Sequence, residues 1–326
     1  MKNQRQSIPT AQRYSIHDFE RQFPDNDACL EHVKERRWPN GVTLCEKCER
    51  ECKHYRVTGR TAYACEFCGN HIYPLAGTIF EKTTTPLRSW FHAMFLMGAT
   101  RCGISAKQIQ REIVVTYKTA WRMAKQIRLL MAEEIKLEGS SVEMDESYYG
   151  PKRRRGSKKG RPSASDPKKT CVVGIVERKG RVVALVSTDA TKQTLHGIAK
   201  ERIMPESVIF TDDYASYNGL ENEGYTHRRI NHSAGVYVLG ETHTQSIDGF
   251  WSLTKNGIRG VYHSVSKKYL QTYLNEYSFR YNRRETPVPM FISLLSLACQ
   301  TGEWTQPSAS ADQSLPASMT EPDEPF

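Results

Sequence analysis

Three carboxylates in this chain of 326 residues stand where they could bind a metal ion together. Asp145 and Asp212 occur in the β-rich runs VEMDESYYG and VIFTDDYASY, and Asp248 occurs in the helical stretch QSIDGFWSLTKNG. Two carboxylates on neighbouring strands, with a third on a helix packed across them, would form an oxygen-ligand site suited to Mg²⁺ or Mn²⁺. A single acidic residue at a strand end is more often a cap or turn residue, so the metal-site interpretation requires that all three converge.

The helix that carries Asp248 has one polar and one apolar stripe. Offsets of 3, 7 and 10 residues keep side chains in line on a 3.6-residue period. The polar stripe contains Gln245, Asp248, Ser252 and Lys255, and the apolar stripe contains Ile247, Phe250 and Leu253. A solvated surface would explain the polar stripe, whereas a metal site would use Asp248 as a ligand and Lys255 to hold a phosphate.

A pair of divalent ions at such a site would suit phosphodiester chemistry. Two ions roughly 4 Å apart can activate a nucleophilic oxygen and stabilise the leaving oxygen. Glu146 and Asp213 adjoin the candidate ligands, but successive strand residues face opposite sides, so we rank them lower. Glu143 faces the same way as Asp145. The pattern therefore favours an enzyme that cuts or joins nucleic acid.

Four cysteines have the spacing of a structural zinc site, C-x2-C-x16-C-x2-C. Cys45 and Cys48 lie in LCEKCER, and Cys65 and Cys68 lie in ACEFCGN. Each C-x2-C knuckle offers two thiolates to one tetrahedral ion, and the residues between the knuckles can form a hairpin. Cys52 and His54 lie close by but break the paired spacing. The sequence predicts one Zn²⁺ with four sulfur ligands and no open position for catalysis.

Residues 105–131 have the pattern of a helix-turn-helix whose second helix is cationic. The side chains that this helix displays are Lys118, Trp121, Arg122, Lys125 and Arg128. Such a face could reach DNA, although an ordinary helical hairpin with a charged solvent face fits the same pattern. The stretch 151–169 is a second cationic segment, a basic loop with nine Lys or Arg and one Asp, among them Arg153, Arg154, Arg155, Lys158 and Lys159. It would attract phosphates without reading sequence.

The composition narrows the class of partner. A net charge of +10 and a pI of about 9.1 indicate a polyanion, which nucleic acid or an anionic membrane surface would supply. The longest apolar runs are about ten residues, too short to span a bilayer, and the amino terminus has no apolar signal region. Nine cysteines without an export signal favour thiols or metal ligands over disulfides. We expect a soluble intracellular protein.

The chain divides into five segments by pattern. Helical periodicity covers 86–138, including YKTAWRMAKQIRLLMAEEI, and short β-rich runs alternate with helices after Gly139. This predicts an α/β or α+β domain built on a mixed sheet. The expected segments are 1–40 as a lead-in with one helix near 26–37, 41–80 as a zinc ribbon, 81–138 as a helical DNA-binding segment, 139–300 as the catalytic domain and 301–326 as a disordered acidic tail.

Several long motifs between about Phe23 and Arg284 occur in the order of a known family. They include CLEHVKERRWPNGVTLCEKC, YPLAGTIFEKTTTPLRSWF, SAKQIQREIVVTYKTAWRMAKQIR, VEMDESYYG, TDDYASYNGL, HSAGVYV, HTQSIDGFWSLTK and YLNEYSFRYNRR. With these motifs the chain resembles the zinc-ribbon insertion-sequence transposases of the acidic-triad (DDE) superfamily, in the ISXO-like branch.

The resemblance implies an RNase H-like catalytic core with acidic positions at Asp145, Asp212 and Asp248, two Mg²⁺ or Mn²⁺ ions, and Lys255 as the basic residue that follows. It implies nicking at transposon ends and attack of the freed 3′-OH on target DNA. The partners would be double-stranded DNA, as terminal inverted repeats and target, and further copies of the chain, in the cytoplasm at the nucleoid.

Two positions depart from the family pattern. The family usually has Asn at the position of Gln245, and Glu or in some relatives Asn at the position of Asp248. Two alternatives remain beside a transposase. One is a domesticated or inactive zinc-ribbon DNA-binding protein, and the other is an RNase H-like structure-specific nuclease.

Overall fold

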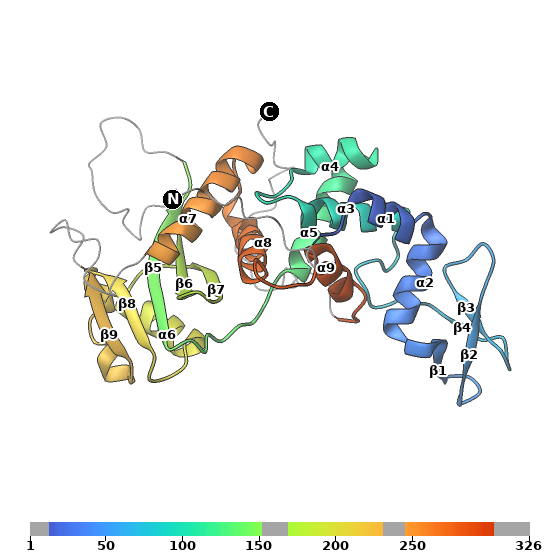
Figure 1. Cartoon of the computed structure of the whole chain (residues 1–326), viewed down its shortest axis with the longest axis horizontal. Coiled ribbons are helices and arrows are strands. Elements are labelled where there is room, and N and C mark those ends of the chain that lie inside the picture. The colour runs from blue at the N-terminus through green and yellow to red at the C-terminus, as the bar shows by residue number, and fades with distance from the viewer. Residues whose placement is uncertain (1–12, 152–168, 231–244, 303–326) are drawn as a thin grey trace, which may run out of the picture.

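A small antiparallel sheet and a larger mixed sheet lie at opposite ends of an elongated molecule, with a group of helices between them (Figure 1). The computed structural model describes residues 13–151, 169–230 and 245–302. Among the helices of these segments, none has the length and apolar character needed to cross a membrane.

Two helices open the described chain, α1 (Ile16–Gln22) and α2 (Asn26–Arg37). Ser15 and Asp25 precede them, and each side chain accepts a hydrogen bond from a backbone N–H of the first turn. These caps satisfy N–H groups that have no partner inside the helix. The helix expected near 26–37 is confirmed, and the next turn begins at Pro39.

Four short antiparallel strands follow in the order β1-β2-β3-β4. Their bounds are β1 Val42–Cys45, β2 Arg50–Arg56, β3 Tyr63–Cys65 and β4 His71–Ile72. The chain reverses at each cysteine knuckle with a positive φ, 54° at Glu49 and 67° at Gly69. These two residues return their N–H groups to the carbonyl oxygens of Cys45 and Cys65, at 2.8 and 3.0 Å, so both knuckles have closed turns.

Three helices form the middle of the molecule: α3 (Leu87–Ala99), α4 (Ala106–Ile113) and α5 (Tyr117–Leu130). Val114, with φ 57° and ψ 50°, turns the chain between α4 and α5, which confirms the predicted helix, turn and helix. The expectation that the helix continues past residue 131 is wrong. Beyond α5 the backbone pairs with another segment, where Leu137 exchanges hydrogen bonds with Arg202 and Met204.

Five strands form the larger sheet in the order β7-β6-β5-β8-β9. Their bounds are β5 Ser141–Tyr149, β6 Thr170–Glu177, β7 Val182–Ser187, β8 Val208–Asp212 and β9 Thr226–Ile230. β6 is antiparallel to β5 and β7, whereas β8 is parallel to β5 and β9. This mixed sheet confirms the predicted α/β, RNase H-like class of fold.

Helices cover both faces of the larger sheet. Val173 and Ile175 of β6 pack with α6 (Lys192–Arg202), while Val172 and Val176 pack with the helices on the opposite face. Those helices are α7 (Gln245–Gly257) and α8 (Leu270–Asn282). β6 is buried along its whole length, because alternate side chains enter two different cores.

Short irregular elements join the main ones. They are the 3₁₀ turns η2 (Pro39–Gly41), η3 (Ala215–Tyr217), η4 (Leu220–Glu223) and η7 (Lys267–Tyr269), and the π-helical turn η6 (Ile258–Tyr262). Between β8 and β9 the chain forms the two turns η3 and η4.

The amino-terminal helices have a core of their own, and the chain returns to it at the carboxyl end. Phe91 and Met94 of α3 lie in the same apolar cluster as Phe291 and Leu294 of α9 (Met290–Ala298). The last helix of the segment 139–300 therefore packs beside α3, away from the larger sheet (Figure 1).

Candidate metal centre and nucleic-acid interface

Asp145 and Asp212 lie on neighbouring parallel strands, β5 and β8. The register pairs Glu143 with Phe210. Because side chains alternate along a strand, Asp145 and Asp212 face the same side as that pair, two residues nearer the carboxyl ends. The β5–β8 pairing ends at Glu143 and Phe210, so the two carboxylates flank the opening between the strands, where ligands of parallel sheets commonly bind.

Each strand carboxylate is held by a hydrogen bond. The indole Nε1 of Trp251 on α7 donates to Asp145 Oδ2 at 2.9 Å. The backbone N–H of Tyr214 donates to Asp212 Oδ1 at 3.0 Å, which makes Asp212 a turn residue as well as a candidate ligand. Trp251 thus orients Asp145 from the helix that carries Asp248.

Helix α7 presents its polar stripe as the sequence predicted. Asp248 is exposed and Lys255 is half-buried, whereas Ile247 and Phe250 are fully buried. The helix crosses above β5 and β6 (Figure 1) and approaches the sheet closely at Gly174. A Cβ added there would come within 2.5 Å of the Trp251 ring and 2.8 Å of Ile247 Cδ1. The approach therefore requires a glycine.

Glu143 fixes the start of α7, a role that the sequence analysis missed. Its carboxylate is fully buried and accepts from the backbone N–H groups of Ser246 and Ile247, at 2.9 and 3.0 Å. A carboxylate suits a helix amino terminus because it satisfies N–H groups that have no partner inside the helix and complements the helix dipole. Arg178 Nε donates to Glu143 Oε1 at 3.1 Å, and its guanidinium lies 3.7 Å from the centre of the Phe210 ring. Sequence spacing offered no signal for a cap more than 100 residues away.

Carboxylates of both the sheet and α7 affect the pKa of Lys255. Burial lowers the pKa of Lys255, and the charges of Arg259 and Lys169 lower it further, while Asp145 and Asp248 act in the opposite direction. Lys255 therefore lies within electrostatic reach of both Asp145 and Asp248. Glu146, which the sequence analysis ranked below Asp145 as a candidate ligand, lies on the opposite side of β5. Its carboxylate accepts a hydrogen bond from the Tyr217 hydroxyl there.

The donor set fits hard divalent ions. Carboxylate oxygens are the ligands that Mg²⁺ and Mn²⁺ prefer, and the carboxylates of Asp145 and Asp248 both act on Lys255. Among the described residues, groups of three or more potential metal donors within 4.8 Å of one another consist of cysteines and His54. The three carboxylates therefore do not all lie within 4.8 Å of one another. Their convergence on metal stays a prediction.

The four predicted cysteines of the ribbon converge, with their sulfur atoms all within 4.8 Å of one another. Sγ of Cys45 lies 3.5 Å from that of Cys68, and Sγ of Cys48 lies 3.8 Å from that of Cys65. A tetrahedral zinc ion with Zn–S bonds of about 2.3 Å requires sulfur atoms roughly 3.8 Å apart. The arrangement therefore fits a single zinc ion.

A second group consists of Cys52, His54 and Cys65. Its potential ligand atoms also lie within 4.8 Å of one another. The two candidate thiols differ in acidity. Backbone N–H groups, chiefly that of Cys68, lower the pKa of Cys65 to about 6, while burial raises the pKa of Cys52 to about 11. Burial raises the pKa of Cys48 to about 12 as well, so acidity does not separate Cys52 from the knuckle cysteines. The four-sulfur group is favoured because its cysteines come from the two closed C-x2-C turns.

Comparison with known proteins identifies the family. Residues 136–282 match the ISXO2-like transposase domain, and residues 24–71 match the transposase zinc-ribbon domain. An uncharacterized protein in the transposable element ISH50 of Halobacterium salinarum is 30% identical over 261 residues, which cover 75% of this chain and 86% of that protein. The chain belongs to the ISXO2-like transposase family.

Two further similarities are weaker. An uncharacterized transposase-like protein of Haemophilus influenzae is 29% identical over 107 residues, which cover 33% of this chain and 85% of that protein. The crystal structure of a pre-cleavage Mos1 transpososome is similar over 61% of this chain and 75% of that one, with 11% identity and a TM-score of 0.26. The predicted resemblance is confirmed by the family matches.

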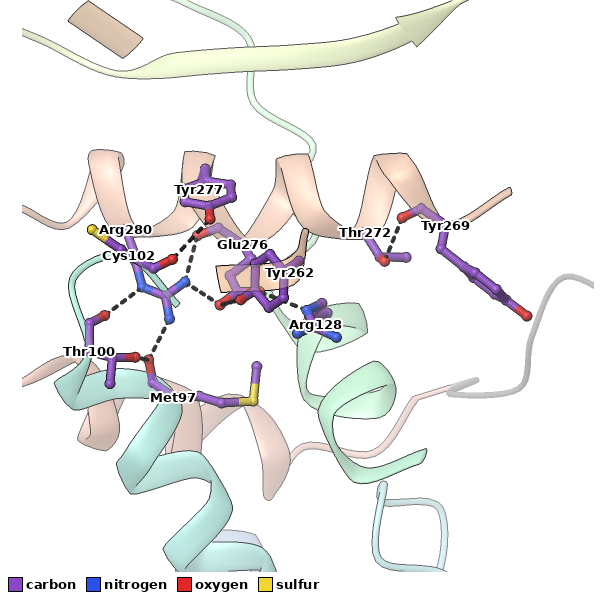
Figure 2. A network of polar contacts seen from close by, with 10 residues as sticks. All are labelled: Met97, Thr100, Cys102, Arg128, Tyr262, Tyr269, Thr272, Glu276, Tyr277 and Arg280. Atoms are coloured by element: carbon purple, nitrogen blue, oxygen red, sulfur yellow. Dashed lines mark hydrogen bonds and ion pairs between the residues drawn. The ribbon is translucent and has the colours of Figure 1, made fainter. Parts of the chain in front are cut away.

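The predicted DNA-binding residues of this transposase lie mainly on the outer side of α5. Lys118 and Arg122 are exposed, and Trp121 and Lys125 are partly buried. Arg128 does not belong to this face, which corrects the sequence analysis. It is only 3% exposed and bonds to Glu276 of α8 (Figure 2). The predicted basic-loop residues Arg153, Arg154, Arg155, Lys158 and Lys159 lie outside the described residues.

Proposed function

We propose that this transposase nicks DNA at the ends of its element and joins the freed 3′-OH to target DNA, using the site formed by Asp145, Asp212, Asp248 and Lys255. The observation that carries the proposal is the placement of Asp145 and Asp212 on one face of adjacent parallel strands, just beyond the point where the pairing of β5 with β8 ends. The helix packed over that face brings Asp248 and Lys255 to the same region.

The roles of the side chains follow from their chemistry. Two divalent ions held by the three carboxylates would activate an attacking oxygen and neutralise charge on the leaving oxygen. Lys255 suits a contact to a phosphate oxygen, because its ammonium group is a compact donor on a flexible stem. Trp251 and Glu143 position the site, since one orients Asp145 and the other holds the start of α7.

The substrate in this proposal is double-stranded DNA, first as the terminal inverted repeats and then as the target. The exposed cations of α5, Lys118 and Arg122, would contact the repeat, and a zinc ion at Cys45, Cys48, Cys65 and Cys68 would hold the ribbon in shape. The net charge of +10 supports a polyanionic partner.

Strand cleavage in vitro tests the proposal. Purified protein is incubated with Mg²⁺ or Mn²⁺ and a labelled duplex that carries the inverted repeat flanking the reading frame. We expect nicking at the repeat end and loss of nicking in Asp212→Asn, while binding to the duplex is retained. Asp213→Asn is the matched control, because this exposed neighbour changes charge equally without altering the site.

Three outcomes decide among the candidate functions. Binding to the repeat without cleavage by the wild-type chain would indicate a DNA-binding protein. Cleavage of branched or mixed-sequence DNA in preference to the repeat would indicate a nuclease. Equal loss of cleavage in Asp212→Asn and Asp213→Asn would show that Asp212 has no role in cleavage that its neighbour lacks.

A further inference from the structure

The segment that joins α7 to α8 is cationic and lacks acidic residues. No Asp or Glu occurs between Asp248 and Glu276. The cations of that stretch are Lys255, Arg259, Lys267 and Lys268, and the last two are exposed. Helix α5 has the same character, with Lys118, Arg122, Lys125 and Arg128 and no carboxylate. Two elements distant in the sequence therefore share one sign of charge.

The backbone of this segment is irregular. A π-helical turn, η6, ends at Tyr262, and the next residue, His263, has φ 59° and ψ −53°. Ser264 N donates to Tyr262 O at 2.6 Å across it, which makes a γ-turn of the strained kind. Residues that carry a side chain seldom adopt this backbone conformation. Both π-turns and strained residues concentrate at functional sites. The irregular course precedes the turn that carries Lys267 and Lys268.

Two aromatic rings join this segment to α5. The rings of Trp121 and Tyr269 lie 5.3 Å apart and meet edge to face. Lys125 Nζ lies 5.5 Å from the Trp121 ring and 5.4 Å from the Tyr269 ring, and Lys268 Nζ lies 5.7 Å from the Tyr269 ring. We call these four residues and Lys267 the junction cluster. Figure 2 shows Tyr269 at the start of α8, with its ring pointing away from the buried ion-pair network.

The lysines of the junction cluster repel one another. Burial lowers the pKa of Lys125, and the charge of Lys268 lowers it further. In the part of the chain that the structure describes, the ion pairs include none with Lys125, Lys267 or Lys268. A packed aromatic pair thus holds like charges together, which is favourable when a polyanion lies across them.

We propose that the junction cluster binds backbone phosphates of duplex DNA that extends from α5 toward the carboxylate site. Helix α8 lies between α5 and α7 (Figure 1), and the cluster joins α5 to the turn just before α8. Arg259 of η6 is exposed and its charge acts on Lys255 of α7, so these two cations lead from the segment before α8 toward the carboxylate site. The contacts position the duplex and read no sequence. This inference rests on the proposed function for its choice of ligand.

The salt dependence of DNA binding tests the cluster. The variant Lys267→Gln/Lys268→Gln is compared with Lys192→Gln/Lys200→Gln, which removes the same charge from α6 on the opposite face of the sheet. Dissociation constants are measured without divalent ions, over a range of salt, for a repeat-bearing duplex and a mixed-sequence duplex. Each lost phosphate contact makes the negative slope of log K against log salt shallower by about 0.9.

We expect the slope of the junction variant to be less negative by about 1.8, and we expect the variant to bind both duplexes more weakly by the same factor. An unchanged slope, or a change equal to that of the α6 variant, would overturn the inference. A loss confined to the repeat-bearing duplex would also overturn it, because it would indicate base reading. Each of these failures leaves the outcome of the Asp212→Asn cleavage experiment, and hence the proposed function, unaffected.

Discussion

Arg128 of α5 and Glu276 of α8 form an ion pair of 2.7 Å in which the side chains are 3% and 0% exposed. Arg280 donates to the same carboxylate at 2.6 Å, and Tyr262 donates at 3.0 Å (Figure 2). Arg280 Nε also donates to the carbonyl oxygen of Thr100, just beyond α3, at 3.0 Å. This network ties the cationic helix α5 to the helix that packs against the larger sheet.

Removing the carboxylate from the network should destabilise the protein strongly. Glu276→Gln leaves two buried guanidinium groups without their countercharge, and breaking such a pair costs about 3–5 kcal/mol. Urea unfolding measures the loss. Lys200→Met is the comparison, because it removes the ion pair between Lys200, whose side chain is 56% exposed, and Glu223. An exposed pair contributes only about 0–1 kcal/mol. Similar losses in the two variants would show that the buried network contributes no more than a surface pair.

The same carboxylate should make stability depend on pH in the acid range. Burial acts to raise the pKa of Glu276, but Arg280 and Arg128 outweigh it and the pKa is lowered. A lowered pKa contributes stability that is present above the unfolded value of about 4.3 and is lost as pH falls toward the folded value. The difference in melting temperature between wild type and Glu276→Gln should therefore shrink below about pH 4. A constant difference would contradict this.

The ribbon should retain zinc without Cys52 and lose it without Cys65. Cys65 belongs to a closed C-x2-C turn of the four-sulfur group, whereas Cys52 lies on β2 outside both turns. Metal analysis should find one zinc per chain in wild type and in Cys52→Ala, and little in Cys65→Ser. Zinc lost from Cys52→Ala as well as from Cys65→Ser would place the ion in the group of Cys52, His54 and Cys65.

Gly174 should be required for the position of α7. Gly174→Ala forces Trp251 and Ile247 outward, and overpacking of this kind costs about 1–3 kcal/mol. Since Trp251 orients Asp145, strand cleavage should fall more than DNA binding. Gly197→Ala on α6 is the matched control, because its Cβ meets nothing within 4 Å and should stabilise the helix by up to about 1 kcal/mol. Unchanged cleavage in Gly174→Ala would show that Trp251 can move without harm.

Local patterns predicted the elements well. The polar stripe of Asp248 and the apolar stripe of Ile247 follow from the helical period, and the cysteine knuckles follow from zinc chemistry, so both could be recognised before any tertiary contact was known. The same reasoning placed Arg128 on a cationic solvent face. It failed because Glu276, the partner that makes burial of Arg128 favourable, lies 148 residues away.

The residues that position the site could not be predicted from local sequence patterns, because their partners also lie far away in the sequence. Glu143 caps a helix that begins more than 100 residues later, and Trp251 reaches Asp145 across a similar separation. A single sequence shows neither contact. Gly174 appears in the sequence as a glycine inside an apolar strand, which signals a close approach, but the helix that approaches is visible only in the fold.

Asp248→Glu is the sharpest test of the helix carboxylate. Asp248→Ala should abolish strand cleavage and leave DNA binding nearly intact, because the residue is exposed and contributes a ligand, not packing. The family usually has Glu here, and the carboxylates of this chain are not all within 4.8 Å of one another. One more methylene lengthens the reach of the side chain toward the strand carboxylates, so we expect Asp248→Glu to cleave faster than wild type at equal DNA affinity. Ser252→Ala, on the same exposed stripe, should leave the rate unchanged. Slower cleavage by Asp248→Glu would mean that the pocket has adapted to the shorter side chain, and full activity in Asp248→Ala would return the polar stripe of α7 to an ordinary solvated face.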